Sequence, residues 1–239
     1  MMRILFLTMQ FGEGYFQGTE RYLQSLAGGL QSRGHRVRIL AGDPEGRRPE
    51  QVGFKRIPTE GWMAVKGTEA SHPRLIEQEL TEFRPDLVHA LNPAHIGVGG
   101  LTAAREQGIP TVITTMDFWW VCPTHTLLRH DERICAGTRH WRECARCIAR
   151  RHQNRVVQAA ASLPVLGTPA SATALTVSAA IRGLPGDERR AWRHRSEHLG
   201  ATLRHADAVI FPAEATHNII DSAYPGLRGH RIPYGVGPG

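Results

Sequence analysis

The chain has 239 residues, of which 41% are hydrophobic, so one large or two small domains with a sizeable core are possible. Its formal net charge is +7, and nearly all of the positive charge is arginine, because Lys55 and Lys66 are the only lysines. No run reaches the roughly 18 apolar residues that a membrane-spanning helix needs, and the N-terminus lacks a cleavage-type site, so we expect a cytoplasmic protein.

Strand-like and helix-like segments alternate along the chain, which predicts an α/β fold with a mostly parallel sheet and helices on both faces. Thr19 is the expected N-cap of the first helix, and Gly34 is expected to end it. Residues 166–186 are rich in small residues and fit a helix or a loop equally. Strands are predicted at residues 3–8, 36–41, 54–57, 87–89, 111–115, 208–211 and 231–233, and helices at 19–33, 73–83, 95–107, 147–161, 187–203 and 212–223.

A glycine-rich turn connects the first predicted strand to the first predicted helix. Gly12, Gly14 and Gly18 let the backbone approach a ligand there, and the free N–H groups of the helix that follows favour an anion. The spacing is not the G-x-G-x-x-G of dinucleotide-binding enzymes, so a dinucleotide-dependent oxidoreductase is poorly supported. A loop without a ligand is the alternative.

The strand predicted at residues 111–115 runs into a carboxylate and three aromatic residues, Asp117-Phe-Trp-Trp. The carboxyl edge of a parallel sheet is where such proteins bind their ligands, so this segment is a candidate site. The long loop that follows, at about residues 117–150, contains every cysteine of the chain.

The four cysteines are Cys122, Cys135, Cys144 and Cys147, and the last two form a Cys-x-x-Cys pair. Because disulfides are rare in cytoplasmic proteins, this spacing favours a structural zinc ion held by four thiolates. A closed zinc site stabilises a loop and does not catalyse. An iron–sulfur cluster and free or disulfide-bonded thiols remain open as alternatives. Two histidines, His125 and His140, are possible substitute ligands.

Two predicted helices carry dense positive charge. A basic helix can dock on anionic lipid, which predicts peripheral contact with the inner face of a membrane, and a solvated face without a partner is the alternative. No nucleic-acid-binding motif accompanies the charge, so nucleic acid is disfavoured as a partner. The residues are Arg150 and Arg151 on one helix, and Arg189, Arg190, Arg193, His194 and Arg195 on the other.

Several short motifs, in this order, make the chain resemble glycosyltransferase family 4. Each is a loose match alone, but together they span nearly the whole chain. The residues that carry the resemblance are Gly18-Thr-Glu-Arg-Tyr22, Arg33-Gly-His-Arg-Val37, Arg84-Pro-Asp-Leu-Val-His89, Gly108-Ile-Pro-Thr-Val112, Asp117-Phe-Trp-Trp-Val-Cys-Pro123, Ala206-Asp-Ala-Val-Ile-Phe-Pro212 and Arg231-Ile-Pro-Tyr-Gly-Val236.

The resemblance implies one half of a GT-B architecture, in which two Rossmann-like domains enclose a cleft. Residues 1–239 correspond to the N-terminal, acceptor-binding domain with a Cys-rich loop insertion, and the C-terminal donor-binding domain is absent. Such enzymes transfer a sugar with retention from a nucleotide-sugar donor to a glycan or lipid-linked acceptor, as in polysaccharide biosynthesis. We therefore expect a transferase that is inactive without a C-terminal domain or partner subunit. A non-catalytic, zinc-stabilised binding module or a subunit of a split enzyme is the alternative.

The resemblance also implies the site residues. Asp117 is the candidate catalytic residue, able to accept a hydrogen bond from a sugar hydroxyl, although an aspartate that caps the next turn is the alternative. The family often has histidine before this aspartate, and Met116 cannot donate a hydrogen bond in its place. The candidate substrate-binding residues are therefore Gly18, Thr19 and Glu20 in the glycine loop, His89, Asn92 and His95 near the strand end, and Trp119, which either stacks on a sugar ring or lies in the core.

Overall fold

The computed structural model describes residues 1–12, 15, 17–43, 54–58, 73–137, 141–151, 155–164, 166–181 and 194–235. Within these ranges one sheet of seven strands has the order β3-β2-β1-β4-β5-β6-β7, and every pair is parallel. The predicted α/β, Rossmann-like class is thus confirmed. The strands are β1 (Arg3–Thr8), β2 (Arg36–Asp43), β3 (Phe54–Pro58), β4 (Leu87–Ala90), β5 (Thr111–Thr114), β6 (Ala208–Phe211) and β7 (His230–Arg231).

The helices agree with the sequence pattern in type and differ from it in their bounds. The first helix begins at Gly18 with Gln17 as its N-cap, and not with Thr19 as the cap. The helix predicted at residues 147–161 is two helices, and the ambiguous segment at 166–186 contains one. The helices are α1 (Gly18–Ser32), α3 (Pro73–Phe83), α4 (Gly99–Glu106), α5 (Trp141–Arg150), α6 (Arg155–Ser162), α7 (Gly167–Ile181), α9 (Arg195–His205) and α10 (Glu214–Ala223).

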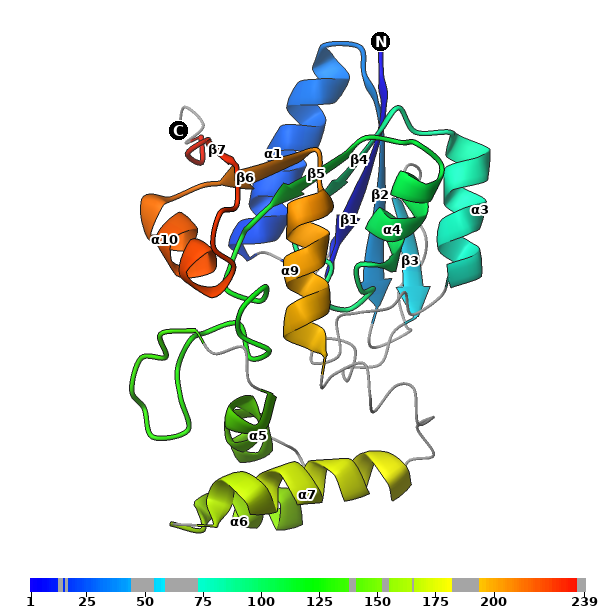
Figure 1. Cartoon of the computed structure of the whole chain (residues 1–239). Coiled ribbons are helices and arrows are strands. Elements are labelled where there is room, and N and C mark those ends of the chain that lie inside the picture. Colours follow the sequence, from blue (N-terminus) through cyan, green and yellow to red (C-terminus); the bar gives the residue numbers. More distant parts are fainter. Residues whose placement is uncertain are drawn as a thin grey trace.

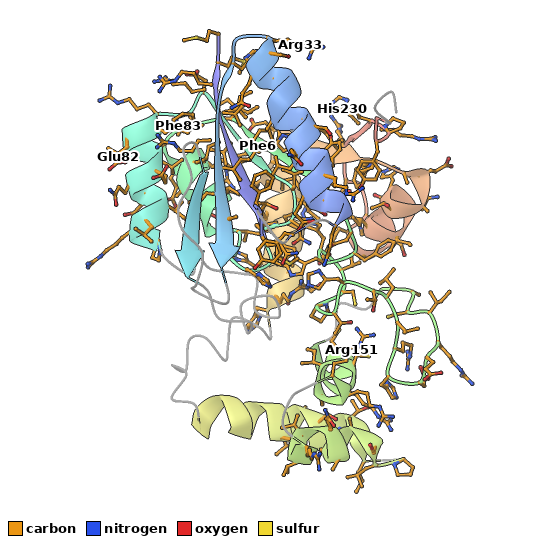
Figure 2. All side chains as sticks on the ribbon, turned by 180° about the vertical axis from the view of Figure 1, so that it is seen from behind. Phe6, Arg33, Glu82, Phe83, Arg151 and His230 are labelled. Atoms are coloured by element: carbon orange, nitrogen blue, oxygen red, sulfur yellow. The ribbon has the colours of Figure 1, made fainter. Side chains whose placement is uncertain are left out.

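Alternate residues of β1 bury their side chains on opposite faces of the sheet, as a strand covered on both sides must. Ile4 and Phe6 pack with Leu23 and Ala27 of α1, while Leu5 and Leu7 pack with residues of α3, α4, α9 and α10. Figure 1 shows α1 behind the sheet and α9 in front of it, and Figure 2 shows Phe6 between the sheet and α1. The sheet is therefore the middle layer of three.

Helix α4 approaches β1 so closely that it has no room for a side chain at Gly100. A Cβ there would lie 2.8 Å from Leu7 Cδ1, whereas a Cβ at Gly28 on α1 would meet no atom within 4 Å. We expect Gly100→Ala to lower the free energy of unfolding by about 1–3 kcal/mol through overpacking. The matched control, Gly28→Ala, should raise it by about 0.5–1 kcal/mol by favouring helix. Urea denaturation measures both, and an unchanged Gly100→Ala variant would contradict this close packing.

Helices α5, α6 and α7 form a separate small unit. Ala145 and Ile148 of α5, Val157 and Ala161 of α6, and Ala172 of α7 share a core that is distinct from the two cores of the sheet. Figure 1 shows this unit beyond the carboxyl ends of β2 and β3. Among the helices that the structure describes, none combines the length and apolar character needed to cross a bilayer.

Candidate functional site at the carboxyl edge of the sheet

Sheet topology decides where the site lies. The chain passes from β1 outward to β2 and β3, and then returns to the other side of β1 as β4. In open parallel sheets, ligands bind outside the carboxyl ends of the strands where the strand order reverses in this way. Here that position lies between β1 and β4, and the loop after β5 borders it.

Asp117 is the centre of a hydrogen-bonded group at this edge. Its Oδ1 accepts the backbone N–H of Trp119 at 2.8 Å, and its Oδ2 accepts Asn92 Nδ2 at 2.5 Å. The Nδ1 atom of His125 lies 3.2 Å from the same Oδ2. The Asp117 side chain is 31% exposed despite these partners. The carboxylate is thus held in one orientation and is still open to a ligand.

Asn92 lies just beyond β4 and is buried. Its Oδ1 accepts the backbone N–H of Ala94 at 3.0 Å, so its Nδ2 is fixed toward Asp117. Since both ends of the Asn92 amide are engaged within the protein, this residue positions the carboxylate. The sequence predicted Asn92 and Asp117 near the same edge of the sheet, and the structure places them in direct contact.

His95 is partly buried beside this group. Burial, together with nearby His125, lowers the pKa of His95 from 6.5 to about 4, although a hydrogen bond with the Met9 backbone acts in the opposite direction. His95 is therefore neutral at pH 7, and it borders the Asp117 group from the side of β1.

His89 lies in the core and not at the edge. Its Nε2 is 2.8 Å from Thr114 Oγ1, its ring packs against Phe6 with centroids 5.1 Å apart, and burial lowers the pKa of His89 from 6.5 to about 4. The expectation that His89 contacts a substrate is not met by this arrangement, because its strand position turns the ring toward the buried layer under α1.

The glycine turn presents the N-terminus of α1 to the same edge. The backbone N–H of Arg21 donates to the Gln17 carbonyl at 3.1 Å, so Gly18, Thr19 and Glu20 supply the first-turn N–H groups that a helix leaves without partners. A Cβ at Gly18 would meet no atom within 4 Å, so the helix is not packed against other residues at this position. Gly14, the middle glycine of the predicted turn, lies outside the described residues.

Glu20 points inward from that helix and is buried. Gln10 Nε2 donates to Glu20 Oε1 at 2.9 Å, and Oε2 has no hydrogen-bond partner among the described residues. The sequence did not identify Gln10, because nothing in its pattern pairs a residue after β1 with a residue in the first turn of α1.

Trp119 and Trp120 are fully buried, with ring centroids 5.1 Å apart in an edge-to-face arrangement. The suggestion that Trp119 stacks on a sugar is corrected by this burial, since the ring has no face open to solvent. Tyr224 donates its O–H to the Trp120 carbonyl at 2.9 Å. The two tryptophans therefore anchor the loop that carries Asp117.

Arg195, predicted on a basic helix face that either docks on anionic lipid or is solvated, is instead only 6% exposed. Its guanidinium donates to the Trp119 carbonyl and lies 4.9 Å from the centre of the Trp119 ring. Burial lowers the pKa of Arg195, and nearby Tyr224, Cys144, Cys122 and Asp117 raise it. No carboxylate of the described residues forms an ion pair with it. The other arginines of that predicted helix, Arg189, Arg190 and Arg193, lie outside the described residues.

The other two predicted basic residues, Arg150 and Arg151, form hydrogen bonds within the protein. Arg151 donates to the Thr126 hydroxyl at 3.1 Å and to the Leu128 carbonyl at 3.4 Å, and Figure 2 shows it beside that loop. Arg150 donates to Ser162 Oγ at 3.0 Å, which links α5 to α6. Both arginines are exposed, but each has a structural partner.

The thiol cluster, defined as Cys122, Cys135, Cys144 and Cys147, lines one pocket of about 30 Å³. All four are free thiols, and burial raises the pKa of Cys144 to about 12. Within the parts of the chain described here, no three His, Cys, Asp or Glu side chains stand close enough to hold a metal ion. His140 is outside those parts, and the histidine next to the cluster is His130, whose Nδ1 lies 4.0 Å from Cys147 Sγ.

Tyr234, near the end of the described chain, closes the edge from the other side. Its hydroxyl donates to the Met116 carbonyl at 3.3 Å, and its ring meets that of Tyr22 with centroids 5.3 Å apart. Burial, with Tyr22 and Asp117 nearby, raises the pKa of Tyr234 to about 12. The phenol thus stays protonated beside Asp117, a neighbour that the sequence did not indicate.

Known proteins resemble this chain in sequence. Two curated relatives are 36% identical to it: the GDP-mannose-dependent alpha-mannosyltransferases of Mycolicibacterium smegmatis (strain ATCC 700084 / mc(2)155), over 91 residues, and of Mycobacterium tuberculosis (strain CDC 1551 / Oshkosh), over 90. Each match covers 35% of this chain and 24% of the relative, so the match spans about a quarter of those proteins' length. Among solved structures, an alpha-glucosyltransferase (AGT) in complex with UDP aligns with 100% of this chain and 43% of its own, at 10% identity and a TM-score of 0.41.

The sequence profile of Glycosyltransferase Family 4 matches residues 16–149, which is more than half of the chain. The matched segment contains the N-terminus of α1, the ends of β4 and β5, Asp117 and the whole thiol cluster. The family predicted from the order of short motifs is therefore confirmed, and the chain belongs to glycosyltransferase family 4.

Proposed function

We propose that this chain is the acceptor-binding half of a GT-B glycosyltransferase. In this proposal it holds a glycan or lipid-linked acceptor in the cytoplasm, while a nucleotide-sugar donor is bound by a C-terminal domain or partner subunit, and the sugar is transferred with retention. The observation that carries the proposal is the Asp117 carboxylate, which Asn92, His125 and the Trp119 backbone hold in place at the edge where the strand order reverses.

Each part of this edge has a chemical role in the proposal. The Asp117 carboxylate accepts a hydrogen bond from a sugar hydroxyl, and its preset orientation reduces the entropy lost on binding. The N-terminus of α1, which is not packed against other residues at Gly18, faces the donor diphosphate and stabilises the charge that develops on it as the sugar departs. GDP-mannose is the first donor to test, because both curated relatives are described as depending on it.

A non-catalytic binding module is the second candidate, and Met116 is the residue that favours it. Its side chain packs with the core under α1, and a thioether donates no hydrogen bond to a transferred sugar. The two candidates make the same prediction for acceptor binding and opposite predictions for transfer.

Transfer assays distinguish them. We expect the 239-residue chain to bind an acceptor glycan by calorimetry, and to transfer mannose from GDP-mannose only when a donor-binding domain of the family is supplied in trans. A panel of free glycans and of lipid-linked glycans in anionic vesicles would identify the acceptor and reveal any peripheral membrane contact. Tight binding of GDP-mannose by the chain alone would contradict the assignment of the donor site. Acceptor binding without transfer in every pairing would favour the binding module.

A further inference from the structure

The thiol cluster is built from two separate parts of the chain. Cys144 and Cys147 are three residues apart on α5, so they share one face of that helix. Cys122 and Cys135 come from the loop after Asp117, where a bridge between Leu128 and Ile134 folds the loop back on itself. Since all four thiols line one pocket, the fold brings together sulfur atoms from both parts.

The size and lining of this pocket limit what it can hold. A volume of about 30 Å³ suits one ion or water molecule, whereas organic ligands need pockets of roughly 300 Å³ or more. Apart from the four thiols, the lining consists of four apolar residues, Val121, Pro123, Leu127 and Leu128, and two polar ones, Thr124 and Arg129. A small pocket in which four sulfur atoms are the main metal-binding groups fits a soft or borderline metal ion.

Arg195 provides a second and independent observation. Its guanidinium is buried, its Nε has no hydrogen-bond partner among the described residues, and Tyr224, Cys144, Cys122 and Asp117 all raise its pKa. A buried cation without a close counter-charge is costly, and no carboxylate of the described residues lies within ion-pair distance of Arg195. Asp117 acts on Arg195 only from farther away. Two of the four groups whose charge acts on Arg195, Cys144 and Cys122, belong to the thiol cluster.

We propose that the thiol cluster binds one zinc ion, and that the buried guanidinium of Arg195 balances the charge of the resulting centre. Four thiols release their protons to solvent as zinc enters, and four thiolates around a divalent ion leave a net charge of two minus. Arg195 offsets half of that charge. As the described residues stand, no three of the sulfur atoms are close enough to share an ion. The sulfur atoms must close to about 2.3 Å from zinc, so binding has to draw the loop cysteines toward α5.

The same contacts connect the zinc site to the Asp117 loop. Arg195 binds the Trp119 carbonyl, and Asp117 binds the Trp119 N–H at 2.8 Å. Zinc bound next to Arg195 would therefore hold the Trp119 backbone, which orients Asp117, in place through contacts from both α9 and α5. The zinc site does not depend on the proposed transfer, because metal content and affinity are measured without any sugar substrate.

Metal analysis of the purified chain tests the site. We expect one zinc per chain, and none in the Cys144→Ser/Cys147→Ser variant, while Ile134→Ser, at an 85% exposed position of the same loop, should retain it. Because the double variant can fail to fold, the wild-type chain is also stripped with a chelator and reloaded with cobalt. Visible absorption of tetrahedral cobalt–thiolate is expected. Iron with labile sulfide, a disulfide, or four free thiols without metal would each overturn the zinc site.

A matched arginine pair tests the role of Arg195. We expect Arg195→Met to lower zinc affinity by about 10–100-fold in chelator competition, and Arg204→Met, exposed on the same helix, to leave it unchanged. A purely structural Arg195 would lower the melting temperature of the zinc-loaded and metal-free chains equally, with zinc affinity unaltered. That result would remove Arg195 from the site.

Discussion

Replacing Asp117 by asparagine is expected to reduce sugar transfer by about 10²–10³-fold when the chain is assayed with a donor-binding domain. Asparagine keeps an oxygen for the Trp119 N–H, but it turns an NH₂ group toward the Nδ2 atom of Asn92 and removes the charge beside His125. Two donors then face each other, so we also expect the free energy of unfolding to fall by about 1–3 kcal/mol. Initial rates and urea denaturation measure the two effects.

The double variant Asn92→Asp/Asp117→Asn separates charge from geometry. In it the amide at 117 donates to the carboxylate at 92, which still accepts the Ala94 N–H, so the hydrogen bond between the two side chains is restored with the charge moved away from His125. Stability should largely recover, while transfer should stay low because the carboxylate no longer lies where the sugar hydroxyl is bound. Recovery of transfer in the double variant would show that Asp117 has only a structural role.

The sheet was predictable from sequence because each strand is a short apolar run bounded by helix-forming segments, and parallel strands buried on both faces have this composition. Helix bounds were less predictable where tertiary packing decides them. A Cβ at Gly167 would lie 2.6 Å from the Arg146 guanidinium, which reaches the carbonyls of Ala161 and Leu163. Arg146 of α5 thus packs between the end of α6 and the start of α7, and the local composition of α7 does not indicate this contact.

Asn92 and Asp117 were predictable as neighbours because both follow adjacent parallel strands whose carboxyl ends meet at one edge. The prediction that Arg195 is exposed was wrong because it relied on the positive charge of the segment and not on the spacing of its buried residues. Arg195, Leu199 and Leu203 recur every four residues and so lie on one face of α9, and all three are buried. That spacing is the feature in the sequence that indicates a buried arginine. Its contact with Trp119 depends on tertiary structure between residues far apart in the chain.

Acidification from pH 6.5 to about 4 is expected to destabilise the fold steeply, because His89 and His95 stay neutral inside it. Burial in the folded chain lowers their pKa values from 6.5 to about 4. Between these two pH values the unfolded chain therefore binds protons that the folded chain does not accept. Each histidine then lowers the free energy of unfolding by up to about 1.4 kcal/mol per pH unit, or about 3 kcal/mol across the window. Stability from these groups is complete above pH 6.5 and is lost as pH falls.

The groups around each histidine define the control. His89 faces Phe6 and Thr114, which do not titrate, so His89→Gln should remove one of the two proton-binding steps and make the pH dependence shallower. His230→Gln, at an exposed position on β7, should leave it unchanged. Arg3 lowers the pKa of Asp86 from 3.8, so that pair loses its effect only below this window. Urea denaturation between pH 7 and about 4.5 measures the slopes, and equal slopes for wild type and His89→Gln would show that His89 is protonated in the folded chain.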